Sequence, residues 1–227
     1  MKLEEYIELS DKQIKQFELY SELLVEWNEK INLTAITEKE EIVLKHFIDS
    51  LTISKYIDKD CKMIDIGTGA GLPGIPLKIC YENINVTLLD SLNKRVVFLK
   101  DVIDKLELKN IEAIHSRAEE LARNPKYREK YDIAVARAVS NLSTLLEYLM
   151  PYVKVGGKCI CMKGPNIKDE ISLAKNALYE LGGEIEKIDN FKLPDSDLER
   201  NLIIIKKIKN TNRKYPRKSG IPSKNPL

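Results

Sequence analysis

The chain has 227 residues, of which 43% are hydrophobic and 32% are charged, a balance typical of a soluble globular protein. No apolar run approaches the ~18 residues that a membrane-spanning helix needs, and the N-terminal stretch MKLEEYIELSDK lacks the apolar core of a secretion signal. Four cysteines are too few for a disulfide framework, and with only two histidines they do not form the spaced pairs of a zinc site. We therefore expect a cytoplasmic protein with reduced thiols, no metal and no membrane contact.

The net charge of +2 hides an uneven distribution of charged residues. Glu199 is the last acidic residue, and residues 206–227 contain eight Lys or Arg, which leaves 29 basic and 35 acidic residues in the rest of the chain. A basic segment attached to an acidic body is typical of a protein that binds a polyanion. The alternative is a solvated, disordered end.

The N-terminal region predicts two helices. Apolar residues with helical spacing indicate a helix over 11–31, and Ser10 with Gln13 resembles a capping box at its start. Thr37 with Glu40 repeats this signature before a second apolar helical pattern. We therefore expect residues 1–60 to form a helical extension whose two helices are joined by the segment NLTAIT.

After residue 60, short apolar runs alternate with helical stretches. Strands are predicted at 62–67, 85–90, 111–116, 131–138, 158–164, 184–191 and 201–208, and helices around 74–82, 93–107, 118–124, 141–151 and 167–181. This alternation predicts an α/β fold with a seven-stranded, mostly parallel sheet and helices on both faces. The last two strands are too close for a helix between them, so we expect a hairpin. The α/β domain is predicted at 61–209, followed by a basic tail at 210–227.

A glycine-rich loop follows the first strand, in the segment MIDIGTGAGLPGIP at 63–76. Open parallel sheets bind ligands at the carboxyl ends of their strands. Glycine allows positive φ there and lets a ligand approach the main chain closely. The loop therefore predicts a cradle for a nucleotide-like cofactor; the alternative is a tight strand–helix turn without a ligand.

The residues around this loop favour S-adenosylmethionine over a dinucleotide. The loop satisfies G-x-G-x-x-G, and Asp90 follows at the distance of the acid that holds the ribose in dinucleotide folds. However, Asp65 directly precedes the loop, where its charge would repel a pyrophosphate, and Pro73 removes an N–H donor. An acid beside a glycine turn suits the cationic S-adenosylmethionine, and Asp65, Gly67 and Gly69 match the first motif of class I methyltransferases. A phosphate P-loop is excluded because no Gly-Lys-Ser/Thr follows.

The sequence resembles the bacterial 16S rRNA guanine-N7 methyltransferase family, also called glucose-inhibited division protein B. The segments that carry the resemblance appear in family order, and they are NLTAIT, KHFIDSL, DIGTGAGLPGIPLKI, SRAEEL, VARAV, MKG, ERNLIIIKK and the ending YPRKSGIPSKNPL. The resemblance implies a class I, Rossmann-like fold and methyl transfer from S-adenosylmethionine to N7 of one guanine. In the family this guanine is position 527 of 16S rRNA, in the small ribosomal subunit.

The resemblance also implies the residues of the cofactor site. These are Gly67 and Leu72 in the loop, Asp90, Ser91 and Leu92 at the ribose, Ala118 and Glu119 at the adenine, and Arg137 at the junction between cofactor and substrate. Each has a plainer alternative. Leu72 could serve loop packing, Glu119 could stabilise a helix N-terminus, and Arg137 could form a structural ion pair with Asp65 or Asp132.

The implied chemistry needs no general base, because guanine N7 carries a free lone pair. We therefore assign no catalytic residue, and expect His46 to be a helix residue at the domain junction. Since N7 must stay open, a cation that reads the base should donate to O6 alone, and Arg137 and Lys163 are the candidates.

The basic tail would add affinity for RNA. Its candidates for phosphate contacts are Arg213, Lys214, Arg217, Lys218 and Lys224, in a stretch that three prolines keep extended and that few apolar residues anchor. Three other functions remain open: a methyltransferase for a small molecule, a nicotinamide-dependent dehydrogenase and a non-catalytic RNA-binding module. Nothing in the sequence demands an oligomer, so we expect a monomer.

Overall fold

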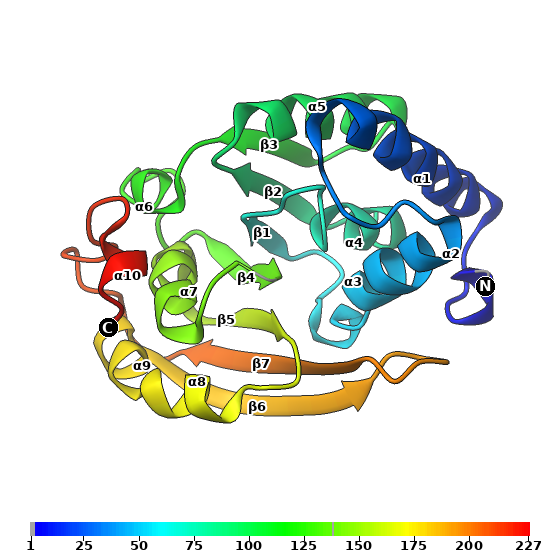
Figure 1. Ribbon diagram of the computed structural model, residues 1–227. Helices are drawn as coiled ribbons and strands as arrows, with labels where there is room; N and C mark the ends of the chain where they lie inside the picture. Colours follow the sequence, from blue (N-terminus) through cyan, green and yellow to red (C-terminus); the bar gives the residue numbers. More distant parts are fainter. Residues whose placement is uncertain (1–2, 138) are drawn as a thin grey trace.

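The computed structural model describes residues 3–137 and 139–227. Its sheet has seven strands in the order β3-β2-β1-β4-β5-β7-β6 (Figure 1). The strands are β1 (Lys62–Ile66), β2 (Asn85–Asp90), β3 (Ile111–His115), β4 (Tyr131–Arg137), β5 (Val153–Lys163), β6 (Gly183–Lys192) and β7 (Glu199–Lys207). β7 pairs antiparallel with both β5 and β6, and the other pairs are parallel, so the predicted hairpin and mostly parallel sheet are confirmed.

Successive residues of the central strands point to opposite faces of the sheet, and each face has its own hydrophobic core. Met63 and Val135 belong to one core, and their strand neighbours Ile64 and Ala134 belong to the other. The first core lies under α1 (Asp11–Ile31), α4 (Gly74–Cys80) and α5 (Asn93–Lys105). The second lies under α7 (Leu142–Leu149) and α9 (Lys175–Leu181), next to α6 (Ala118–Leu121) and α8 (Lys168–Leu173). Helices therefore cover both faces, as expected for a parallel sheet.

The N-terminal region packs onto the first core. Helix α1 begins after Ser10 with the predicted capping box, in which Gln13 and Ser10 satisfy each other's backbone N–H groups. The short η1 (Leu3–Glu5) precedes it. Phe17, Tyr20 and Leu24 of α1 are buried in the same cluster as residues of α4 and α5. The extension thus shares a core with the sheet.

The second N-terminal helix differs from the prediction. It comprises α2 (Lys39–Ile42), the π-helical turn η2 (Val43–Ile48) and α3 (Asp49–Leu51), followed by η3 (Ser54–Tyr56). Its N-cap is Glu38, without a side-chain cap, so the capping box at Thr37 and Glu40 was wrong. A π-turn carries one residue more per hydrogen-bonded ring, which rotates the following side chains. Asp49, directly after it, points into the interior and is 4% exposed.

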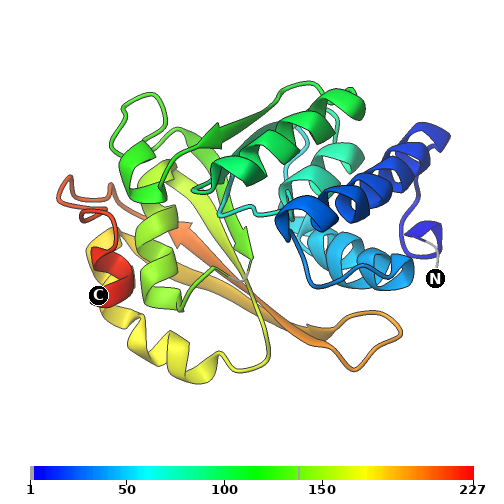
Figure 2. The same ribbon diagram turned by 45° about the horizontal axis from the view of Figure 1, so that its top comes forward.

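Two further predictions about the second half were wrong in detail. The helix predicted at 167–181 is divided at Ala174 into α8 and α9. The fifth strand begins at Val153 rather than residue 158, directly after η4 (Met150–Tyr152). The hairpin of β6 and β7 projects past the rest of the sheet, toward the N-terminal helices (Figure 2). No helix among the described residues is long and apolar enough to span a membrane.

The basic tail is folded, so the prediction of an extended, unanchored stretch was wrong. It leaves β7 and ends in the short helix α10 (Ile221–Lys224), beside α6 and α7 (Figure 1). Tyr215 is 5% exposed and belongs to the second core, and Leu227 packs against the same cluster. Pro222 is buried, and its carbonyl accepts a hydrogen bond from the Thr144 hydroxyl. The prolines therefore shape turns that return the chain to the sheet.

Candidate functional site

The glycine loop joins the carboxyl end of β1 to α4. Gly67, Gly69 and Gly71 all have positive φ, which allows the chain to turn sharply above the sheet. Gly67 donates its N–H to the carbonyl of Leu89, and Gly69 donates to Oδ2 of Asp90, both on β2. The loop is therefore held against the end of the neighbouring strand, at the place where an open sheet binds ligands.

Asp65 braces this loop from inside the sheet. Its Oδ2 accepts hydrogen bonds from the Thr68 hydroxyl at 2.7 Å and from the Gly74 N–H at 2.9 Å. Its other oxygen, Oδ1, has no hydrogen-bond partner among the described residues, although the side chain is fully buried. Burial raises the pKa of Asp65 to about 6, while these two hydrogen bonds act in the opposite direction. The carboxyl group thus fixes the turn and keeps one buried acceptor free.

A cleft lies beside the loop, at the carboxyl ends of β1, β2 and β3. Five of the predicted cofactor residues line it, namely Gly67, Asp90, Ser91, Ala118 and Glu119. Its other lining residues were not predicted from the sequence, and they are Ile66, Leu89, Ser116, Arg117, Val139 and Tyr148. The cleft has a cavity volume of about 130 Å³. Strand-end position was a signal for some of these residues, but Tyr148 comes from α7 and only tertiary structure brings it here.

The other predicted cofactor residues do not line the cleft, and they are Asp65, Gly69, Leu72, Leu92 and Arg137. Leu72 is 5% exposed and belongs to the first core, which agrees with its packing alternative. Leu92 donates its N–H to Oδ1 of Asp90, while its side chain is exposed. Asp65 lies beneath the loop.

The polar groups of the cleft fit S-adenosylmethionine. Asp90 and Glu119 line it with two carboxylates and Arg117 with one cation, so the acidic lining residues outnumber the basic one, which favours a cationic ligand over a phosphate. Oδ2 of Asp90 accepts hydrogen bonds from the Gly69 N–H and, at 3.5 Å, from Arg95, while Oδ1 accepts one from the Leu92 N–H and has a further lone pair for a ribose hydroxyl. Gly69 has no atom closer than 4.0 Å to the position of an added Cβ, so the main chain stays open to a ligand.

Arg137, at the end of β4, forms an ion pair that joins the sheet to the N-terminal region. Its guanidinium donates to Oδ2 of Asp49 at 3.1 Å and to the carbonyl of Lys45 at 3.0 Å. The partners expected from the sequence, Asp65 and Asp132, were wrong. Arg200 of β7 binds the other oxygen of Asp49 at 3.0 Å, so two arginines share one buried carboxylate. The sequence analysis missed Asp49 and Arg200, although both lie in segments that carry the family resemblance.

Comparisons with known proteins agree with this geometry. Residues 13–203 match the family described as "GidB: rRNA small subunit methyltransferase G". The chain belongs to this family. The relative from Acetivibrio thermocellus, named Ribosomal RNA small subunit methyltransferase G, is 58% identical over 222 residues, which cover 97% of this chain and 91% of the relative. A relative of the same name from Clostridium novyi is 53% identical, with 97% of this chain and 92% of the relative covered.

Solved structures share the fold at low identity. A SAM-dependent methyltransferase from Aquifex aeolicus has a TM-score of 0.54 at 18% identity and covers 74% of this chain and 93% of its own. M. jannaschii TYW2 in complex with AdoMet has a TM-score of 0.53 at 13% identity, with 90% of this chain and 80% of that chain covered. The class I methyltransferase fold and the family predicted from the sequence are therefore confirmed, and this member of the family is an S-adenosylmethionine-dependent methyltransferase.

Two further cationic candidates of this methyltransferase lie in ion pairs. Lys163, at the end of β5, donates to Glu170 at 2.6 Å and to the carbonyl of Ser140, and its side chain is 9% exposed. Arg217 of the tail contacts Glu147, which is fully buried, through Nε and Nη2 at 2.7–3.1 Å. Both side chains therefore stabilise the fold around the carboxyl edge of the sheet.

The tail also reaches the cofactor cleft. Gly220 donates its N–H to Oε1 of Glu119, which lines the cleft, at 3.0 Å. Lys214 and the Tyr215 hydroxyl both contact Glu180 of α9. The contact with Gly220 gives Glu119 a structural partner that neither sequence alternative included. Of the tail cations proposed to bind RNA, Arg213, Lys214, Lys218 and Lys224 are exposed.

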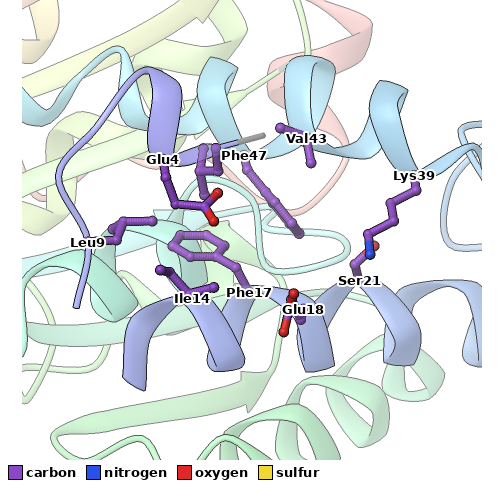
Figure 3. A pocket seen from close by; sticks show the side chains of 10 residues that line it. Glu4, Leu9, Ile14, Phe17, Glu18, Ser21, Lys39, Val43 and Phe47 are labelled. Carbon is purple, nitrogen blue, oxygen red and sulfur yellow. The ribbon is translucent and has the colours of Figure 1, made fainter. Parts of the chain in front are cut away.

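A second pocket lies away from the cleft, between η1, α1 and the second N-terminal helix (Figure 3). Apolar side chains that include Ile14, Phe17 and Phe47 form its interior, with Glu18 and Lys39 also on its wall. It shares no lining residue with the cofactor cleft. His46 is nearby in sequence but buried, and its Nε2 lies 2.9 Å from the Thr34 hydroxyl. Burial lowers the pKa of His46 to about 4, so it stays neutral at pH 7.

Asp65→Asn is expected to change how stability depends on pH. The folded pKa of about 6 exceeds the ordinary value of 3.8, so folding favours the protonated carboxyl. Its contribution to stability is complete below pH ~4 and is lost as the pH rises through ~6, a loss of about 3 kcal/mol. Asparagine does not titrate. Urea unfolding between pH 4 and 7.5 should therefore show the wild type losing stability relative to the variant, and a constant difference would contradict the raised pKa.

Asp90→Ala is expected to weaken S-adenosylmethionine binding by about 1–3 kcal/mol, or roughly 5- to 150-fold. The variant loses the charged acceptor for the ribose and the brace on Gly69 and Leu92. Isothermal titration calorimetry measures the effect, and thermal melting without ligand shows whether the variant is folded. Asp90→Asn keeps one acceptor oxygen, so its S-adenosylmethionine affinity should lie between those of the wild type and Asp90→Ala. Unchanged S-adenosylmethionine affinity in a folded Asp90→Ala protein would mean that Asp90 only holds the loop and does not bind the ribose.

Proposed function

We propose that this methyltransferase transfers a methyl group from S-adenosylmethionine to N7 of one guanine in small-subunit ribosomal RNA. The observation that carries the proposal is the cleft itself. It combines a glycine loop, two lining carboxylates and a strand-end position in a chain of this family. The guanine implied by the family resemblance is position 527 of 16S rRNA.

In this proposal each side of the cleft holds one part of the cofactor. S-adenosylmethionine, when bound, supplies an electrophilic methyl group. Asp90 accepts hydrogen bonds from the ribose, with Ser91 and Leu92 beside it, and Ala118 and Glu119 flank the adenine. The Gly220 N–H fixes the Glu119 carboxylate, so this wall is set before the ligand arrives.

The protein's part in the reaction is alignment. Guanine N7 attacks without losing a proton, so no general base is needed. The position of His46 is consistent with this, because His46 is buried and contacts Thr34 and is therefore not placed to act as a general base. Positive charge moves from sulfur to the purine during transfer, and the carboxylates of the cleft stabilise it electrostatically.

Arg137 and Lys163 lie at the ends of adjacent strands, β4 and β5, which supports them as candidates for contact with the acceptor base. Each already has a carboxylate partner, Asp49 for Arg137 and Glu170 for Lys163. Because these carboxylates already accept hydrogen bonds from Arg137 and Lys163, fewer N–H donors of the two side chains remain for the base. We propose that one cation donates to O6 and leaves N7 open, unlike the usual two-bond Arg–guanine contact.

The direct test is methyl transfer with a mapped product. The protein is incubated with labelled S-adenosylmethionine and unmodified small-subunit rRNA, and the position of the label is found by cleavage specific for N7-methylguanine. A single labelled guanine is the expected result. Label on another atom would contradict the proposed acceptor, and RNA binding without transfer would favour a non-catalytic module.

Calorimetry separates the other functions. S-adenosylmethionine should bind and NAD should not, since the lining carboxylates repel a pyrophosphate. Tight NAD binding would favour a dehydrogenase. Methyl transfer to a small molecule but not to RNA would agree with the methyltransferase fold and would contradict the proposed RNA substrate.

We also propose that the protein acts as a cytoplasmic monomer. Its four cysteines are free, as expected in a reducing compartment. One copy of the chain supplies every residue of the proposed site. Size-exclusion chromatography with light scattering should give a mass near 26.0 kDa.

A further inference from the structure

A groove lies at the edge of the sheet opposite to the cofactor cleft. Its walls are the segment 123–130, which leads into β4, and the turn 210–213, which follows β7. β7 runs antiparallel to β5 and pairs Lys206 with Lys158, so its end meets the amino ends of the parallel strands. The groove has a cavity volume of about 780 Å³. It is therefore separate from the site of methyl transfer.

The groove is strongly positive. Four of its lining residues are basic, namely Arg123, Arg128, Lys130 and Arg213. Glu129 is its one acidic lining residue, and this carboxylate is used by the buried Lys207 at 3.1 Å, by the Asn210 amide and by the Thr211 N–H. The four cations are thus not neutralised by the wall of the groove.

Two of the arginines hold the walls together through backbone carbonyls. Arg128 donates to Ala122, Thr211, Asn212 and Tyr215, and Arg123 donates to Pro216. Carbonyls orient these guanidinium groups without cancelling their charge.

The positive charge of the groove exceeds the single negative charge that Glu129 supplies. Burial lowers the pKa of Arg128, and the charges of Arg213 and Arg123 act in the same direction, while Glu129 opposes them. Over residues 3–137 and 139–227, neither the Arg213 guanidinium nor the Lys130 ammonium has a hydrogen-bond or ion-pair partner. A bound anion requires cationic groups that the fold orients and N–H donors that are not already used, and the groove has both.

We propose that this arginine groove binds phosphate groups of the RNA backbone, at a distance from the methylated base. The inference rests on the proposed function, because a ribosomal RNA substrate presents many phosphates beyond its target loop. Guanidinium groups match phosphate geometry, and phosphate contacts fix the orientation of a protein on RNA without reading sequence. The polyanion contact expected of the tail thus extends through Arg213 to residues far from it in sequence, while Arg217 is held by the buried Glu147.

The test reverses the two cations that have no structural contact. The variant Lys130→Glu/Arg213→Glu is compared with Lys15→Glu/Lys100→Glu, which makes the same charge change at exposed positions of α1 and α5. Affinity for unmodified small-subunit rRNA is measured over a range of salt concentrations. The groove variant should bind roughly tenfold more weakly, and its log–log salt slope should flatten by about 1.5, while the control variant keeps the wild-type slope.

A second substrate separates the groove from the reaction. On a short hairpin that carries only the target loop, the groove variant should keep the wild-type kcat/KM and S-adenosylmethionine affinity. An equal loss on the hairpin would place the effect at the methyl-transfer site and overturn the groove.

Failure of the proposed function is visible independently. A wild-type protein that methylates neither RNA would overturn that function, while the affinity measurement still decides the groove. Full-length RNA affinity and salt slope equal to the wild type would overturn the groove. Inorganic phosphate could raise the melting temperature of the wild type but not of the groove variant, while the two proteins bind RNA equally well. The groove would then bind free anions, and this result would also overturn the RNA contact.

Discussion

Arg217→Ala is expected to lower the free energy of unfolding by about 3–5 kcal/mol, the cost of leaving a buried charge without its partner. Glu147 is 0% exposed and receives three side-chain hydrogen bonds from Arg217 and a fourth from its backbone N–H at 2.7 Å. The substitution leaves only the backbone bond. Urea unfolding of the ligand-free protein measures the loss.

Three variants make this result specific. Lys218→Ala changes the exposed neighbouring cation and should alter stability by no more than about 0.5 kcal/mol. Arg217→Lys keeps the charge but cannot make the two-pronged contact, so it should fall in between. Glu147→Gln added to Arg217→Ala removes the unpaired charge and should restore part of the stability. A stable Arg217→Ala protein with weakened RNA binding would instead favour the RNA contact predicted from the sequence.

The same substitution has a consequence at the cleft. The tail beyond Arg217 supplies the Gly220 N–H that holds Glu119. If Arg217 anchors this segment, Arg217→Ala should also weaken S-adenosylmethionine binding, although the tail does not line the cleft. Affinity equal to the wild type in a destabilised variant would limit Arg217 to a role in stability.

Gly69→Val is expected to abolish S-adenosylmethionine binding, with a loss above roughly 100-fold, while the protein remains folded. The residue has φ of +60°, a conformation that costs a β-branched side chain about 1–3 kcal/mol. An added Cβ meets no atom closer than 4.0 Å, so the fold leaves room for it. The side chain extends into the space where the ligand approaches the main chain.

Gly156→Val provides a matched control for this strain. Gly156 has φ of +88°, and nothing lies within 4 Å of its added Cβ, yet it is in β5 outside the cleft. The two variants should lose similar stability in thermal melting, and only Gly69→Val should lose binding in calorimetry. Retained binding in Gly69→Val would mean that the loop does not cradle the cofactor.

The amino-acid sequence by itself determined the sheet, the glycine loop and the cofactor class. Strand and helix patterns are local, and the rule that ligands bind at the carboxyl ends of parallel strands needs only the order of the elements. This is why the glycine loop and Asp90 could be assigned to one site, whereas Ala118 and Glu119 were added to it through the family resemblance. Their convergence follows from the pairing of β1, β2 and β3.

Only the tertiary structure decided which charges meet. Arg137 pairs with Asp49, 88 residues away, and Arg217 pairs with Glu147, 70 residues away, although several acids were nearer in sequence. A charged residue carries no local signal for its partner, because the pairing depends on how helices and turns pack in three dimensions. The basic tail therefore suggested a free polyanion-binding strand, whereas packing assigned Arg217 to the fold and brought Arg213 to a groove that three distant cations complete.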